Sequence, residues 1–172
     1  LGEVGIAYES QFLGFTREQA IDEMSARYEV MRRSVAKGLD SKTTQLAWLR
    51  PHAVDVLGKL ESGGLPFGTI HTRAAARALA AMHTCNSRGI VCAAPTGGSA
   101  GVLPGVLMTL EEELHLDREA VARALFAAGA VGLVMAIRAT FAAETAGCQV
   151  EIGIAGAMAT AAAVEAVGGA AG

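Results

Sequence analysis

The fold of this chain is decided by residues 93–107, Ala93-Ala94-Pro95-Thr96-Gly97-Gly98-Ser99-Ala100-Gly101-Val102-Leu103-Pro104-Gly105-Val106-Leu107. Small residues fill the first half, two prolines bound the glycine-rich part, and an apolar run typical of a helix follows. Glycine lacks a Cβ and tolerates positive φ, so such a loop brings backbone N–H groups close to a bound anion. The stretch therefore predicts a turn that presents donors to an anion or a carboxylate, followed by a buried helix.

Apolar residues recur at helical spacing on both sides of this loop. Thr16 and Gln19 form a capping-box pattern, Gly38 suits a helix end, and Asp117 suits a helix start. We expect helices over 16–38, 51–61, 72–83, 102–113, 117–144 and 152–167, and a strand only over 89–93. The sequence predicts an all-α fold, a compact bundle of alanine- and glycine-rich helices around the Pro-Thr-Gly-Gly-Ser loop, in a single domain over 1–172.

Composition narrows the function classes. Of the 172 residues 52% are hydrophobic but only 5% are aromatic, so the core must consist of small aliphatic side chains and closely packed backbones. A net charge of −3 gives no basic surface for nucleic acid or an anionic membrane. The chain has three cysteines, an odd number that does not suggest a disulfide framework. This cysteine usage indicates a reducing compartment, the cytoplasm. The apolar run 124–137, which lies between Arg123 and Arg138, is shorter than the about 20 residues of a membrane span.

A second motif lies near the end of the chain, Gly147-Cys148-Gln149-Val150-Glu151-Ile152-Gly153. It places a lone cysteine among small residues, with a carboxylate three positions later. On a helix, Cys148 and Glu151 would share one face. Taken alone, Cys148 also fits a small buried hydrophobic residue, and Glu151 fits a buried carboxylate that backbone donors satisfy.

Together with Phe126-Ala127-Ala128-Gly129-Ala130 and Glu29-Val30-Met31-Arg32-Arg33-Ser34-Val35, these two motifs resemble the α chain of iron–sulfur L-serine dehydratases. The resemblance covers nearly the whole chain. It implies an all-helical catalytic domain that works without pyridoxal phosphate and uses a [4Fe–4S] cluster, one iron of which has no cysteine ligand and acts as a Lewis acid on the substrate hydroxyl. It further implies a cytoplasmic lyase of amino-acid metabolism and gluconeogenesis that converts L-serine to pyruvate and ammonia.

The resemblance also assigns roles to residues of this chain. It implies that Cys148 ligates the cluster and that Glu151 or His83 transfers the proton. The other cluster cysteines are expected beyond Gly172, in which case the chain is an incomplete catalytic domain. Cys85 and Cys92 lack a metal-binding spacing. The residues expected to hold the substrate carboxylate are Thr96, Gly97, Gly98 and Ser99.

Three short segments depart from the family pattern. Arg50-Pro51-His52 stands where the family has Gly-Gly-Asp, His83-Thr84-Cys85 where it has Glu-x-Asn, and Arg138-Ala139-Thr140 where it has Asn-Ala-Ser. One interpretation places them in the pocket, with Arg138 and Thr140 contacting the substrate. The added positive charge would then suit a more anionic substrate. The other interpretation places them on helix surfaces, without a role in binding.

Two alternatives to serine dehydration therefore stay open. The same scaffold would dehydrate a hydroxy acid with a second carboxylate, or eliminate sulfide from cysteine. Alternatively, the chain is a helical binding or assembly module without a cluster. The expected partners are a small amino or hydroxy acid, a β-type domain or subunit, and a second copy in a homo-oligomer, but neither nucleic acid nor a membrane.

Overall fold

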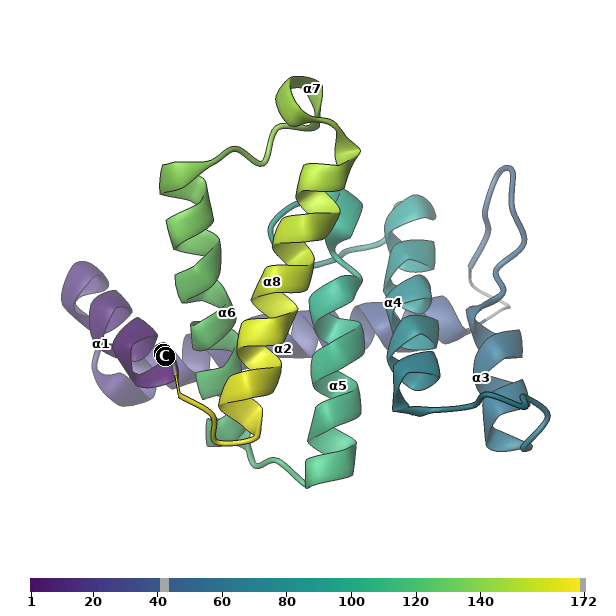
Figure 1. Cartoon of the computed structure of the whole chain (residues 1–172), viewed down its shortest axis with the longest axis horizontal. Coiled ribbons are helices and arrows are strands. Elements are labelled where there is room, and N and C mark those ends of the chain that lie inside the picture. The colour runs from purple at the N-terminus through teal and green to yellow at the C-terminus, as the bar shows by residue number, and fades with distance from the viewer. Residues whose placement is uncertain (41–43, 171–172) are drawn as a thin grey trace.

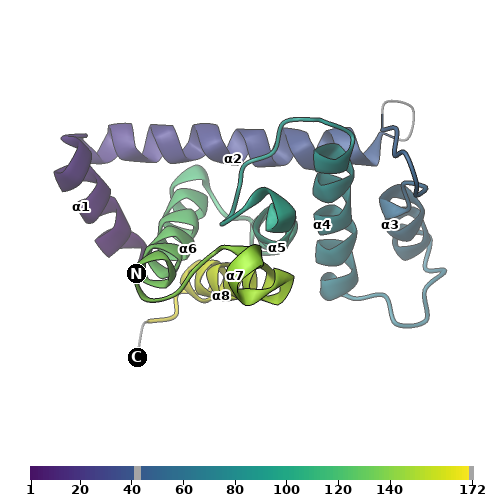
Figure 2. The ribbon, with the colours of Figure 1, turned by 90° about the horizontal axis from the view of Figure 1, so that it is seen from above.

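A capping box starts the longest helix of the chain. The Thr16 hydroxyl accepts a hydrogen bond from the Gln19 N–H (3.2 Å), and the Gln19 side chain accepts one from the Thr16 N–H (2.8 Å). The helix that follows, α2 (Arg17–Leu39), has 23 residues. In the computed structural model, which describes residues 1–40 and 44–170, α2 runs along one side of the molecule and the other helices pack across it (Figure 2).

Most of the other helices stand side by side across α2, with α1 (Gly2–Leu13) and α3 (Ala53–Glu61) at its opposite ends (Figures 1 and 2). The described residues contain no strand, so the all-α prediction is confirmed and the expected strand over 89–93 is wrong. The remaining elements are α1 (Gly2–Leu13), α3 (Ala53–Glu61), α4 (Ile70–Asn86), the 3-10 turn η1 (Gly97–Ser99), α5 (Val102–Leu114), α6 (Arg118–Arg138), α7 (Ala143–Ala146) and α8 (Cys148–Ala166).

The helix expected over 117–144 is in fact interrupted. Asp117 caps α6 as predicted, by accepting a hydrogen bond from the Ala120 N–H at 2.8 Å. The helix ends at Arg138 because the Thr140 hydroxyl accepts the Ala142 N–H at 3.0 Å, a local bond that replaces the helical one. Gly147 then adopts a φ of 81°, and α8 begins at Cys148 instead of residue 152.

Gly38 does not end α2, which continues to Leu39. Its role is to let α2 and α4 touch: a methyl group at Gly38 would lie 1.7 Å from the carbonyl oxygen of Ala80. The same device recurs between α4 and α5, where methyl groups at Gly101 and Gly105 would lie 2.3 and 2.5 Å from backbone oxygens of α4. Close backbone packing thus takes the place of large side chains, as the low aromatic content predicted.

Substituting alanine for Gly38 tests this packing. Replacing glycine by alanine inside a helix ordinarily raises the free energy of unfolding by about 0.5–1 kcal/mol. At Gly38 we expect the opposite, a loss of about 1–3 kcal/mol or more, because the new methyl group meets backbone that cannot move aside. Gly58→Ala in α3, which meets nothing within 4 Å, is the matched control and should be neutral or stabilising. If the unfolding midpoints of both variants in denaturant moved in the same direction, the close packing at Gly38 could not be the cause.

The main core lies where α2, α5, α6 and α8 meet. It is built around Leu103, Leu107, Leu125 and Met158, all nearly inaccessible to solvent. Polar bonds reinforce the contacts of α5 with its neighbours. The hydroxyl of Tyr28 on α2 donates to Glu111 Oε2 at 2.6 Å. Buried Arg77 on α4 donates to the Thr109 hydroxyl at 3.0 Å and to Glu112 at 2.6 Å.

Helix α6 is the one helix among the described residues that is long and apolar enough to cross a membrane. It is also a core helix: its first half is buried against α1, α2 and α8, with Leu125 and Phe126 almost fully enclosed. Its second half exposes Val134 and Ile137. Burial inside a folded domain accounts for the apolar character of the first half.

Candidate functional site

The two motifs singled out in the sequence meet at one end of the bundle. There α4 ends and both α5 and α8 begin (Figure 1). The turn η1, which connects α4 to α5, packs against α4 and against α8. The glycine-rich loop and the Cys148–Glu151 turn are therefore neighbours in space, although about 50 residues separate them in the chain.

The loop presents free donors, as expected of an anion site. The Thr96 and Ser99 hydroxyls are hydrogen-bonded to each other at 3.1 Å. The N–H of Ser99 donates to the Thr96 carbonyl and the N–H of Ala100 to the Gly97 carbonyl, both at 3.4 Å. The N–H groups of Gly97 and Gly98 donate to no residue within 1–40 and 44–170, and both glycines are exposed. Two backbone donors are thus available to a carboxylate.

Glu151 lies against this loop. A methyl group at Gly98 would be 2.7 Å from Oε2 of Glu151, so the carboxylate occupies the space that glycine leaves open. Glu151 belongs to the first turn of α8, where the helix dipole favours an acidic side chain. Glu151 is only half-buried, so the alternative of a buried, backbone-satisfied glutamate does not fit the structure. Its role as a proton acceptor stays a prediction.

Cys148 is the first residue of α8, one turn before Glu151. Its side chain is exposed, which contradicts the alternative of a small buried hydrophobic residue. An exposed thiol beside the loop fits one cysteine ligand of an iron–sulfur cluster. No group of three or more His, Cys, Asp or Glu residues arranged for a metal occurs in the described ranges. The role of Cys148 as a cluster ligand therefore stays a prediction.

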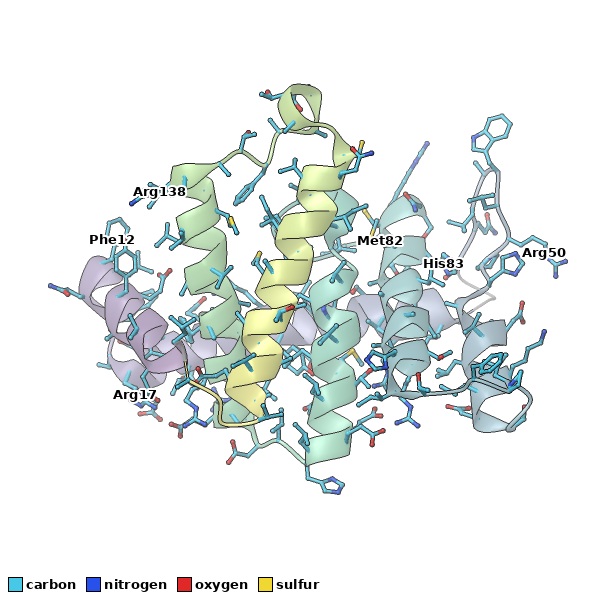
Figure 3. The ribbon with its side chains drawn as sticks, viewed as in Figure 1. Phe12, Arg17, Arg50, Met82, His83 and Arg138 are labelled. Carbon is cyan, nitrogen blue, oxygen red and sulfur yellow. The ribbon has the colours of Figure 1, made fainter. Side chains whose placement is uncertain are left out.

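The structure does not bring His83 to the loop. His83 and Met82 leave α4 on different sides (Figure 3): Met82 contacts Gly101 at the start of α5, whereas His83 faces Gly38 and His52. His83 is buried, and its Nδ1 atom has no hydrogen-bond partner among the described residues. Burial lowers the pKa of His83, the backbone of Gly38 acts in the opposite direction, and the nearby His52 lowers the pKa further.

This burial predicts a pH dependence of stability. The unfolded chain binds a proton at His83 near its ordinary pKa of 6.5, whereas the folded chain binds it only at lower pH. Stability is therefore fully present above about pH 6.5 and is lost as the pH falls toward the folded pKa. We expect His83→Gln to flatten the fall in melting temperature between pH 7 and pH 5. His71→Gln, at an exposed position, should leave the slope as it is in the parent protein; equal slopes in all three proteins would contradict the assignment.

The other residues expected to line a positive pocket do not gather around the loop. Arg138 is exposed at the end of α6 and points away from α8, and Arg50 points outward at the opposite end of the molecule (Figure 3). His52 lies beside Asp55, at 3.6 Å. The Thr140 hydroxyl is occupied by the Ala142 N–H, and no described hydrogen bond joins it to the loop. For Arg50, His52 and Arg138 the surface interpretation fits the geometry, whereas His83 is buried.

One loop contact was missed by the sequence reasoning. The thiol of Cys85 donates to the carbonyl oxygen of Gly97 at 3.6 Å, at the end of α4. The structure explains the contact: Ala78, Met82 and Cys85 follow the i, i+4, i+7 pattern on one face of α4, and the first two contact Gly101. Cys85 therefore faces the loop, whereas His83, two residues earlier, faces away.

Comparison with known proteins gives the family of the chain. The sequence profile of the serine dehydratase alpha chain matches residues 3–172. The chain belongs to this family. It is 38% identical, over 98% of its length and 56% of the relative's, to a probable L-serine dehydratase alpha chain of Bacillus subtilis. It is 34% identical, over 90% of its length and 53% of the relative's, to the L-serine dehydratase alpha chain of Peptoniphilus asaccharolyticus.

A third relative, a probable L-serine dehydratase alpha chain of Latilactobacillus sakei, is 51% identical over 58% of this chain and 48% of its own length. The chain thus spans about half the length of the curated relatives that it matches. No solved structure matches it.

Proposed function

We propose that this chain is the catalytic α part of an iron–sulfur L-serine dehydratase, a lyase that converts L-serine to pyruvate and ammonia. One observation carries the proposal: the loop with the free N–H groups of Gly97 and Gly98 meets the carboxylate of Glu151 at Gly98, and Glu151 lies one helical turn from the exposed thiol of Cys148. The family membership of residues 3–172 supports the same activity.

The loop binds the substrate carboxylate. Gly97 and Gly98 supply backbone donors, and the hydroxyls of Thr96 and Ser99, which now bond to each other, turn toward the anion. Glu151 adds a negative charge next to these donors. A zwitterionic amino acid satisfies both, since it carries a carboxylate and a neighbouring ammonium group. A second carboxylate would instead be repelled, so the dicarboxylate alternative has no support at this site.

Glu151 accepts the α-proton. The electron pair of the Cα–H bond forms the Cα–Cβ double bond, the Cβ–O bond breaks, and hydroxide leaves. The resulting enamine takes up a proton at Cβ, and water then hydrolyses the imine to pyruvate and ammonia. The carboxylate of Glu151 suits this step because it belongs to a rigid helix and touches the loop that orients the substrate.

Cys148 provides one ligand of a [4Fe–4S] cluster. When bound, the cluster supplies a Lewis-acidic iron for the substrate hydroxyl, which makes hydroxide a better leaving group. The exposure of Cys148 at the start of α8 lets its thiolate bind without any rearrangement of the core. The relatives carry the name alpha chain, and we propose a β-type partner, assembly into a homo-oligomer and a cytoplasmic location for this protein as well.

The test is an anaerobic assay of the complete protein with its cluster intact. We expect pyruvate to form from L-serine, with much lower rates for L-cysteine and for a hydroxy dicarboxylate such as malate. An intact cluster spectrum without pyruvate from serine would reject the substrate, and a faster reaction with malate would revive the dicarboxylate alternative. A complete protein that binds no iron would point to the binding module instead.

A further inference from the structure

We infer that Cys85 is a positioning residue that orients the substrate-binding loop by holding the carbonyl of Gly97. The inference rests on the proposed function and identifies what fixes the geometry of that site. It begins with the hydrogen bond from the Cys85 thiol to the Gly97 carbonyl oxygen, at 3.6 Å. Of the three segments that depart from the family pattern, the one containing Cys85 has a hydrogen bond to the loop in the described structure.

Few contacts hold Gly97 in place. It is exposed, and a Cβ at this position would meet nothing within 4 Å. Its carbonyl accepts a long 3-10 bond from the Ala100 N–H at 3.4 Å, and the Cys85 thiol is the second donor. Glycine loses more backbone entropy than any other residue when its conformation is fixed. Each of the two hydrogen bonds to the Gly97 carbonyl is therefore important for holding the turn.

Peptide planarity carries the effect from Gly97 to the substrate. The C=O of Gly97 and the N–H of Gly98 belong to the same peptide unit, and in a planar trans unit they point in opposite directions. A thiol that holds the oxygen on the α4 side therefore turns the Gly98 N–H away from α4. Gly98 is also the residue against which Glu151 lies. Cys85 thus fixes the direction of a donor for the substrate carboxylate.

The support behind Cys85 is rigid. One and two turns earlier on the same face of α4, Met82 and Ala78 contact Gly101, at 2.9 and 2.3 Å from where its Cβ would be. These contacts fix the end of α4 against the start of α5. Because Cys85 is only partly exposed, its side chain is confined between the helix and the loop.

Two measurements on the complete protein test the inference: amide hydrogen exchange of the peptide that contains residues 96–100, and the steady-state kinetics with L-serine. Cys85→Ala should speed exchange of this peptide and raise KM about two- to fivefold, the range of a weak S–H···O bond, with kcat nearly unchanged. Cys85→Ser, which keeps a donor, should restore both values. Cys92→Ala removes a partly buried thiol elsewhere and should change neither.

Loop exchange that is the same in Cys85→Ala and in the parent protein would overturn the inference, whatever the activity. So would a KM that stays constant while exchange rises, or a kcat that falls without a change in KM. If the parent protein forms no pyruvate from serine, the proposed function fails, while the exchange measurement still decides whether Cys85 orders the loop.

Discussion

Glu151→Gln should lower the kcat for serine by about 10²–10⁴-fold, the usual contribution of a positioned general base. Glutamine keeps the shape of the side chain and its place against Gly98 but cannot accept the α-proton. We therefore expect the iron content and the melting temperature to change little, whereas serine should bind more weakly because its ammonium group loses a charged partner. Glu144→Gln, an exposed carboxylate in the neighbouring helix α7, serves as the control and should retain the parent rate.

A second variant separates the charge of Glu151 from its position. Gly98→Ala leaves the carboxylate intact but puts a methyl group 2.7 Å from Oε2, so the flexible end of Glu151 must move away. The backbone need not shift, and the protein should fold normally. We expect kcat to fall in this variant too, without a loss of iron. Washout of deuterium from α-deuterated serine monitors the proton transfer directly; washout at the parent rate in Glu151→Gln would rule this residue out as the base.

The local part of this site could be predicted from the sequence. A glycine-rich turn and a capped helix start are made by residues close together in the chain, so Thr96 to Ser99 and the pair Cys148 and Glu151 could be singled out. The pairing of the two motifs followed from resemblance to a family. Their spatial contact depends on α8 packing beside η1, which no local pattern reveals.

Sequence reasoning misjudged features whose position is decided by the face of a helix or by a single hydrogen bond. His83 and Cys85 are two positions apart, about 200° around α4, so only one of them can face the loop. Helical periodicity did not indicate which, since alanines line α4 on several sides. The end of α6 at Arg138 depends on the hydroxyl of Thr140, within a run whose apolar character predicted an unbroken helix.

Cys148→Ser should abolish the cluster and, with it, serine dehydration. A serine hydroxyl is a poor ligand for iron–sulfur clusters, which are held by thiolates. Because Cys148 is exposed at the first position of α8 and supports no core contact, the apo form of the variant should melt at the same temperature as the apo form of the parent. Loss of iron can then be assigned to the missing ligand and not to unfolding.

Iron and acid-labile sulfide, determined on anaerobically purified complete protein, provide the measurement. We expect about four iron atoms per chain in the parent protein and almost none in Cys148→Ser. Cys92→Ser makes the same atomic change at a thiol that packs against the main core, and it should keep the full iron content. If Cys148→Ser also kept its iron and sulfide, Cys148 could not be a ligand. The arrangement of loop, carboxylate and thiol would then have to work without metal at this helix end.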